Sequence, residues 1–243
     1  MQYLCAFMQN PSLDIVLPCY NPQEGWTLSI SQSFEKISSA LPETTSRLII
    51  VNDGCAKNIT ADVRTLQEKF PNLIFESYPD NKGKGFAVRT GVARATADVV
   101  IYTDIDFPYE ENGFLTIYAA LQKNSCDIAL AIRDENYYDN VPAARRFISK
   151  LLKSIVRLTL RTPTADTQAG LKGFNKKGRE VFLKTTINRY LFDLEFIWLA
   201  ARQKDLRISC IPVKIKAGVI FRKMHFSILL TEAWNFLKIF LKP

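Results

Sequence analysis

Short apolar runs alternate with helical patterns along the first half of the chain. The apolar runs are rich in β-branched and aromatic residues and are bounded by turn residues, which predicts buried strands at 13–18, 48–51, 73–77, 98–102 and 128–132. Between these runs, apolar residues recur every three or four positions, which predicts amphipathic helices at 25–41, 60–70 and 113–121 and another that ends near 95. Strands that alternate with helices at this spacing predict an α/β fold with a mostly parallel sheet flanked by helices.

The second half of the chain carries fewer strand signals. A loop at 166–170 continues through 171–174 and leads to a helix near 177–183. A further helix is predicted at about 192–201, and the apolar run at 208–213 predicts a late strand.

A basic stripe follows one face of a helix predicted between the strand at 128–132 and the loop at 166–170. Its members recur at steps of three or four residues, and the positions between them are mostly apolar: Arg146, Lys150, Lys153, Arg157 and Arg161. A core-facing helix with a solvated face has this pattern too, but such helices usually mix charges to gain ion pairs, and this stretch contains no acid. We therefore favour an amphipathic helix on an anionic membrane surface. The apolar tail at 226–241 has a similar interfacial character, or else covers the domain.

The composition limits the class of protein. The 243 residues are sufficient for one large α/β domain, and no Pro/Gly/Ser-rich linker divides them. The net charge of +8 is compatible with nucleic acid, anionic lipid or phosphorylated small molecules as partners. We do not expect nucleic-acid binding, because the basic residues concentrate on one helical face rather than in a groove-sized patch with stacking aromatics.

Cysteine usage and the termini predict where the chain folds. The five cysteines are scattered and form no Cys-x-x-Cys pair, which indicates reduced thiols rather than a disulfide framework or zinc site. The start lacks the basic segment and length of a signal peptide, and no run of 18 residues is apolar enough to cross a bilayer. We expect a cytoplasmic protein that is peripheral at the cytoplasmic face of a membrane.

Two segments carry candidate chemistry. Asp104 and Asp106 follow the predicted strand at 98–102, and carboxylates at the carboxyl end of a strand suit a divalent cation that holds substrate phosphates, although a solvated turn is the alternative. A glycine-rich turn at 80–85 leads into a helix, where exposed amides and lysines attract phosphate, although a flexible turn with solvated lysines is equally compatible.

A series of motifs in this order resembles the inverting glycosyltransferase family 2, and most closely its dolichyl- or polyprenyl-phosphate hexosyltransferase branch. The likeness covers about 13–213 and rests on Val16–Asn21, Val51–Gly54, Asn81–Gly85, Arg89–Gly91, Asp104–Asp106, Asp166–Phe174 and Phe192–Glu195. The Asp-Thr-Gln form of the motif at 166–168 favours glucosyl over mannosyl members.

The resemblance implies a GT-A fold, in which a Rossmann-like nucleotide half merges with an acceptor half. We therefore expect a GT-A domain at 1–216, with the nucleotide-sugar half at about 13–106 and the acceptor half at about 107–216. A C-terminal amphipathic segment would follow at 217–243.

The resemblance also implies roles for individual residues. Contacts to the nucleotide sugar are expected from Pro18, Tyr20, Asn21, Asp53, Gly54, Lys84, Gly85 and Asp104. The ligands of Mg²⁺ or Mn²⁺ would be Asp104, Asp106 and Gln168. The catalytic residues would be Asp106 and Asp166, the latter as the base if one is used. Guanidinium forks match phosphate oxygens, so the candidates for the acceptor phosphate are Arg133, Arg145 and Arg146.

The resulting hypothesis is a metal-dependent inverting hexosyltransferase. It would move a hexose, with glucose favoured, from a nucleoside diphosphate sugar to a polyprenyl phosphate at an anionic membrane surface. UDP-glucose is the favoured donor and GDP-mannose the alternative. Three other functions fit the same motifs: a family member with a saccharide acceptor in surface polysaccharide synthesis, a metal-dependent nucleotidyltransferase, and a catalytically degenerate membrane-surface adaptor.

The basic stripe generates a prediction about membranes. Replacing Arg146, Lys150 and Lys153 together by Gln should weaken binding to anionic liposomes, because each Lys or Arg near such a surface contributes about 1 kcal/mol of attraction. The salt dependence of binding should weaken as well. Sedimentation with vesicles at low and high salt measures both effects. Unchanged binding would remove the membrane-surface helix from the account.

Overall fold

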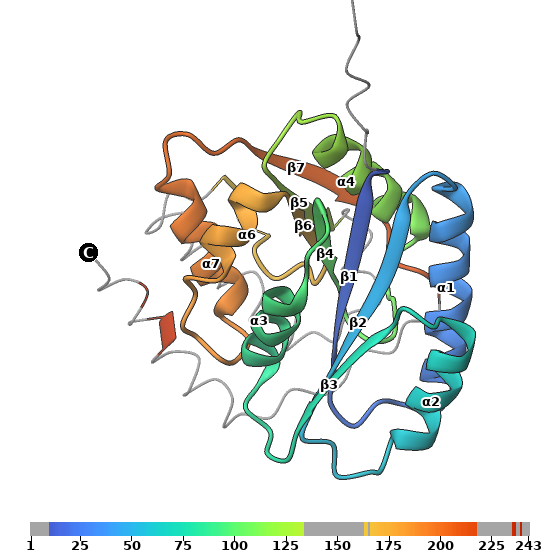
Figure 1. Ribbon diagram of the computed structural model, residues 1–243. Helices are drawn as coiled ribbons and strands as arrows, with labels where there is room; N and C mark the ends of the chain where they lie inside the picture. Colours follow the sequence, from blue (N-terminus) through green and yellow to red (C-terminus); the bar gives the residue numbers. More distant parts are fainter. Residues whose placement is uncertain (1–9, 134–162, 165, 218–234, 237–238, 240–243) are drawn as a thin grey trace, which may run out of the picture.

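The computed structural model describes residues 10–133, 163–164, 166–217, 235–236 and 239. Within these residues the chain forms a seven-stranded sheet with the strand order β3-β2-β1-β4-β6-β5-β7 (Figure 1). The strands are β1 (Ser12–Cys19), β2 (Thr45–Asp53), β3 (Ile74–Tyr78), β4 (Val99–Tyr102), β5 (Ile128–Arg133), β6 (Lys172–Phe174) and β7 (Ile208–Val213). All neighbours pair in parallel except β6, which is antiparallel to both β4 and β5. The predicted mostly parallel sheet is confirmed.

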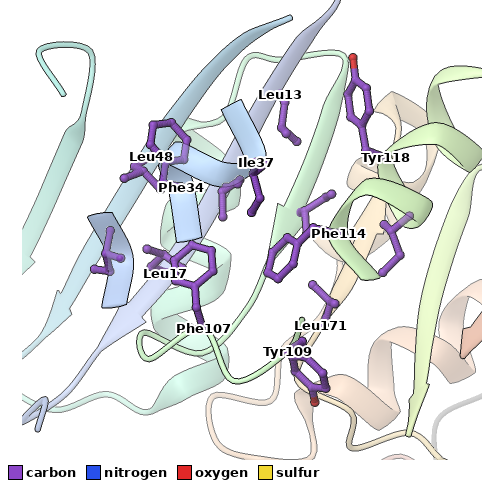
Figure 2. Close-up of a cluster of buried hydrophobic side chains, with 14 of the residues drawn as sticks. Leu13, Leu17, Phe34, Ile37, Leu48, Phe107, Tyr109, Phe114, Tyr118 and Leu171 are labelled. Atoms are coloured by element: carbon purple, nitrogen blue, oxygen red, sulfur yellow. The ribbon is translucent and has the colours of Figure 1, made fainter. Parts of the chain in front are cut away.

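Helices cover both faces of the sheet (Figure 1). The helices are α1 (Trp26–Ala40), α2 (Thr60–Lys69), α3 (Lys84–Arg94), α4 (Glu111–Gln122), α6 (Lys176–Phe182) and α7 (Phe192–Ala201). One core layer joins α1, α2 and α4 to the side chains of alternate strand positions such as Leu17 and Leu48 (Figure 2). The other joins α3, α6 and α7 to the intervening positions, such as Val16 and Val51. This alternation follows from the two-residue period of a strand.

The sequence predicted these elements closely, with one exception. The stretch 171–174 was expected to be a loop, but Lys172–Phe174 forms β6 in the middle of the sheet. The prediction was wrong because Lys and Gly are rare in strands, and the three residues are too few for a periodic pattern. Gly173 is needed here, since an added Cβ would lie 2.7 Å from Ile117 Cγ2 of α4.

Two other expectations fall on residues that the structure does not describe. The basic stripe between 146 and 161 lies wholly outside the described residues, and the tail at 226–241 lies outside them apart from 235–236 and 239. Among the residues that are described, we find no helix with both the length and the apolar character that a bilayer crossing requires.

The sheet topology gathers several chain segments at one edge. β1, β2 and β4 are parallel, so their carboxyl ends, at Cys19, Asp53 and Tyr102, lie on the same side. The order in which strands are added to the sheet reverses at β1: β2 and β3 lie on one side of it, and β4 lies on the other. Ligands of open α/β sheets bind outside such a switch point. Because β6 is antiparallel, its first residue, Lys172, pairs with Tyr102, and the loop before it reaches the same edge.

Helix α3 lies close to the sheet because a glycine occupies the contact point. A Cβ added at Gly91 would lie 2.4 Å from Val16 Cγ1 and 3.1 Å from Val51 Cγ2. Real side chains do not approach this closely, so any larger residue must push the helix away. The position of the glycine-rich turn at the start of α3 therefore depends on Gly91.

Replacing Gly91 by Ala should lower the free energy of unfolding by about 1–3 kcal/mol through overpacking, although Ala is normally the better helix former. Urea denaturation measures this change. Gly113→Ala in α4 is the matched control, because its Cβ would lie 3.0 Å from Val213 Cγ1 and needs a smaller adjustment. Equal effects of the two substitutions would contradict the role of the α3 contact.

Candidate functional site

The two acidic residues of the Asp-x-Asp motif lie on a tight turn after β4. Asp104 is partly exposed and Asp106 is exposed, and the Phe107 amide donates to the Asp104 carbonyl oxygen at 3.0 Å. Phe107 has a φ of 47°, which is rare for a bulky residue. Its ring is fully buried and stacks on Phe114 with 5.4 Å between the ring centroids (Figure 2). Burial of this ring offsets the backbone strain of about 1–3 kcal/mol and fixes the turn that carries both carboxylates.

Lys84, the first residue of α3, forms an ion pair with this motif. Its Nζ lies 2.5 Å from Asp104 Oδ1. Burial lowers the pKa of the Lys84 ammonium, but the attraction of Asp104 and Asp193 outweighs it, so the pKa stands above its ordinary value. Gly170 lies against the same pair, since an added Cβ would be 2.5 Å from Asp104 Oδ2 and 3.5 Å from Lys84 Nζ. The loop at 166–170 therefore passes directly over Asp104.

That loop is held at both ends. Asp166, at its start, is buried and forms an ion pair with Arg133, whose backbone amide also donates to Asp166 Oδ2 at 2.9 Å. At its end, the Gly170 amide donates to the Tyr109 hydroxyl at 2.8 Å. Gln168 lies between these anchors, and its buried Nε2 has no hydrogen-bond partner among the described residues. The side-chain amide of Gln168 is thus available to a ligand at this edge.

A buried cluster of polar side chains supports the loop and the strand end. Lys172 is fully buried, and its Nζ donates to the Ala169 carbonyl oxygen at 2.5 Å and pairs with Asp193 Oδ1 at 2.8 Å. The Tyr102 hydroxyl donates to the same Asp193 oxygen at 2.5 Å. Burial lowers the pKa of Lys172, although Asp193 counteracts this, and burial with Asp193 raises the pKa of Tyr102 well above its ordinary value. One carboxylate thus joins β4, β6 and α7.

Asp53, at the end of β2, holds the glycine-rich turn. Its buried carboxylate accepts hydrogen bonds from the Lys82 amide at 2.8 Å, from the Gly83 amide at 3.0 Å and from Asn81 Nδ2 at 2.9 Å. Gly83 has a φ of 102°, and a Cβ there would lie 2.5 Å from the Asn188 carbonyl oxygen. Only glycine fits this backbone and this close approach.

The turn is also supported from the side of α7. The buried Glu195 carboxylate accepts from the amides of Thr186 and Ile187, both at 2.8 Å, and so fixes the loop before α7. Arg89 of α3 donates to the Ile187 carbonyl oxygen at 3.2 Å and to Asn188 Oδ1. The start of α3 is therefore fixed between β2 and the loop before α7.

The tips of β1 and β2 are joined by side-chain hydrogen bonds. Cys55 Sγ accepts from the Asn21 amide at 3.1 Å, and Asn21 Oδ1 accepts from the Ala56 amide at 2.9 Å. Cys19 Sγ lies 4.0 Å from Cys55 Sγ, a proximity that the 36-residue separation in sequence conceals. Tyr20 lies beside this junction with 44% of its surface exposed.

The structure brings most of the predicted residues to one edge of the sheet. The segments at this edge carry Pro18, Tyr20, Asn21, Asp53, Gly54, Lys84, Gly85, Asp104, Asp106, Arg133, Asp166 and Gln168. Arg145 and Arg146 lie outside the described residues. Sequence reasoning missed Tyr109, Lys172 and the buried roles of Asp193 and Glu195. The lysine between apolar neighbours was a signal in the sequence that Lys172 could be buried. Asp193 and Glu195 gave no such signal, because acidic residues are common in the first turn of a helix.

The donor set suits a hard divalent cation. Within the described part of the chain, no three His, Cys, Asp or Glu side chains gather as they would in an all-protein metal site. Two carboxylates and an amide oxygen, at Asp104, Asp106 and Gln168, instead match Mg²⁺ or Mn²⁺, which share their coordination with substrate phosphates and water. Gly170 lies against Asp104 Oδ2, so the loop that carries Gln168 runs beside this carboxylate.

This fold and this set of side chains are typical of α/β proteins that bind nucleotides at the carboxyl edge of the sheet. A comparison with protein families makes the class specific. Residues 14–182 match the family model described as glycosyl transferase family 2, and the chain belongs to that family.

Curated relatives cover most of the chain. A dolichyl-phosphate beta-glucosyltransferase of Trichomonas vaginalis is 24% identical over an alignment of 235 positions, which covers 93% of this chain and 72% of the relative. A second such enzyme of the same organism is 23% identical over 82% of this chain and 62% of the relative. The chain thus spans 62–72% of the length of these two relatives.

Solved structures confirm the GT-A-like fold. Mannosyl-3-phosphoglycerate synthase from Rubrobacter xylanophilus has a TM-score of 0.68 at 15% identity. The match covers 94% of this chain and 72% of the synthase. Glucosyl-3-phosphoglycerate synthase from Mycobacterium tuberculosis, in complex with Mn²⁺, UDP and phosphoglyceric acid, has a TM-score of 0.64 at 16% identity, with coverages of 96% and 80%.

The Asp53 contacts generate a prediction about the turn. In Asp53→Asn one carboxylate oxygen becomes an NH₂ group that faces amide donors, so the free energy of unfolding should fall by about 1–3 kcal/mol. Hydrogen exchange of the Lys82 and Gly83 amides should accelerate at the same time. Asp80→Asn, a change at an exposed neighbour, should leave both quantities unchanged. Unaltered exchange in Asp53→Asn would show that the turn does not depend on this carboxylate.

Proposed function

We propose that this protein transfers a glucosyl group from UDP-glucose to a polyprenyl phosphate, with inversion at the anomeric carbon. The family and the two relatives named as dolichyl-phosphate beta-glucosyltransferases support this reaction. The observation that carries the proposal is the arrangement at the end of β4, where Asp104 meets Lys84 and the loop at 166–170. Cations and carboxylates in this position suit a diphosphate and its metal ion.

The donor would lie along the tips of β1 and β2 and the glycine-rich turn. Pro18, Tyr20, Asn21 and Gly54 lie at these tips, and the exposed Tyr20 ring offers a surface on which the base can stack. Asp53 already binds the amides of the turn, so we assign it the positioning of that turn. Lys84 and the backbone at Gly85, at the start of α3, would bind the diphosphate.

Asp104, Asp106 and Gln168 would hold Mg²⁺ or Mn²⁺. When bound, such an ion neutralises the charge that grows on the leaving diphosphate. The Mycobacterium tuberculosis structure that contains Mn²⁺ and UDP supports a divalent ion in this fold. The protein contributes by fixing the turn that carries both carboxylates, which the buried Phe107 anchors.

The acceptor phosphate would approach from the side of Arg133. In the reaction, a phosphate oxygen forms a bond to the anomeric carbon as the bond from that carbon to UDP breaks, and the electron pair leaves with UDP. A phosphate monoester has a second pKa of about 6 and is mostly ionised at neutral pH, so it needs little help from a base. The Asp166 carboxylate accepts three donors of Arg133, and we therefore assign it mainly the orientation of that guanidinium. Arg145 and Arg146 would complete the phosphate contacts.

A lipid acceptor implies action at a membrane surface. We place the protein peripherally at the cytoplasmic face, with the basic stripe between 146 and 161 as the contact to anionic lipid. The solved neighbours carry names of enzymes that make phosphoglycerate glycosides. A test of acceptors must therefore compare polyprenyl phosphate with 3-phosphoglycerate.

Donor binding provides the test of function. UDP-glucose with Mn²⁺ at about 100 times its dissociation constant should add about 2.7 kcal/mol to stability, which is visible as a raised melting temperature. UDP-galactose, UDP-N-acetylglucosamine and GDP-mannose should shift it less. Radiolabelled glucose should then pass to polyprenyl phosphate and not to 3-phosphoglycerate. A failure of every donor to shift the melting temperature would favour the degenerate adaptor instead.

Asp106→Asn sharpens this test, because it removes one carboxylate ligand and keeps the side-chain shape. Its turnover should fall by about 10²–10³-fold, the range for loss of one group that stabilises transition-state charge. Asp98→Asn is the matched control at the opposite end of β4 and should keep its activity. Full activity in Asp106→Asn would exclude the proposed metal site.

A further inference from the structure

Lys84 occupies the place at Asp104 that a metal ion would need. Its ammonium lies 2.5 Å from Asp104 Oδ1, at the distance of a strong charge-assisted hydrogen bond. The other oxygen, Oδ2, lies against the backbone at Gly170, where a Cβ would come within 2.5 Å. The Asp104 carboxylate is therefore already paired with a cation that belongs to the protein.

An ammonium and a divalent ion cannot share one carboxylate oxygen without strong repulsion. Like charges only a few ångströms apart repel strongly near a protein surface, and a divalent ion doubles the product of the charges. Lys84 must therefore leave Asp104 before an ion binds there. The Lys84 side chain is partly exposed, at 22% of its surface, so it has room to move from Asp104 toward a ligand at this edge.

We propose that Lys84 and the divalent ion compete for Asp104. The donor diphosphate attracts the Lys84 ammonium to its own oxygens and so frees Asp104 for the ion. This inference rests on the proposed function. Lys84 disfavours the metal ion when no donor is present and binds the diphosphate when the donor arrives. Metal and donor then bind together, and the metal alone binds weakly.

The neighbouring lysine provides a matched control. Lys82 is exposed and carries the same charge two residues earlier in the same turn. Its Nζ lies over the rings of Tyr78 and Phe86, at 5.2 and 4.8 Å from their centroids. Removal of either lysine lowers the net charge equally, so a difference between the two variants isolates the contact with Asp104.

The experiment measures Mn²⁺ affinity by electron paramagnetic resonance, with UDP absent and then present. The site is defined as the Mn²⁺ binding that Asp106→Asn removes. Lys84→Met should bind Mn²⁺ alone about tenfold more tightly than the wild-type protein, within the 5- to 150-fold range of coupled sites. With saturating Mn²⁺, the same variant should bind UDP more weakly. Lys82→Met should match the wild-type protein in Mn²⁺ affinity.

Lys84→Arg and Lys84→Gln complete the set. Lys84→Arg keeps a cation at this position and should bind Mn²⁺ alone as weakly as the wild-type protein. Lys84→Gln removes the cation and should bind Mn²⁺ alone about tenfold more tightly, which provides the measurement if Lys84→Met fails to fold. Equal affinity for Mn²⁺ alone in the wild-type protein and in the charge-removing variants Lys84→Met and Lys84→Gln would overturn the competition and leave the proposed function intact. Absence of Mn²⁺ binding to the wild-type protein even with UDP would overturn the metal-dependent function itself.

Discussion

The buried ion pair between Lys172 and Asp193 is the interaction on which the rest of the site depends. It lies between β6 and α7, with the Tyr102 hydroxyl of β4 on the same carboxylate. Loss of one partner of such a pair costs about 3–5 kcal/mol, because the other charge is left buried without compensation. Apolar residues of similar volume would give comparable stability. The pair therefore matters for where it places atoms: it holds the Ala169 carbonyl, and with it the loop that carries Asp166 and Gln168.

Local pattern was sufficient to predict most of the fold. The strands are apolar runs and most of the helices have one apolar face, so hydrophobic pattern located them to within a few residues, whereas α7 is buried on nearly every side. β6 could not be found in this way, because it exists only through its neighbours: β4 and β5 supply its hydrogen bonds, and α4 requires the glycine at 173. A lysine in a central strand is stable only because Asp193, far along the chain, neutralises it.

The candidate site was predictable as a set of residues but not as a set of contacts. The motifs place Asp104, Lys84 and Gln168 in the site, since the carboxyl ends of parallel strands meet at one edge. They do not reveal that Lys84 pairs with Asp104, or that the Asp53 carboxylate accepts hydrogen bonds from the amides of the glycine-rich turn. Each of these contacts joins residues 20 or more positions apart, so it depends on tertiary structure rather than on local preference.

These contacts also determine which parts of the site can change on donor binding. The glycine-rich turn is fixed from one side by Asp53 and from the other by the loop that Glu195 holds. The side chain of Lys84 is different, because Asp104 and Asp193 both stabilise its ammonium. Its ammonium contacts Asp104 at 2.5 Å, and under the proposed function a diphosphate at the start of α3 would offer the same ammonium a second set of anionic oxygens. Under the proposed function, an exchange of partners by this one side chain, with the turn left in place, would admit both a diphosphate and a metal ion.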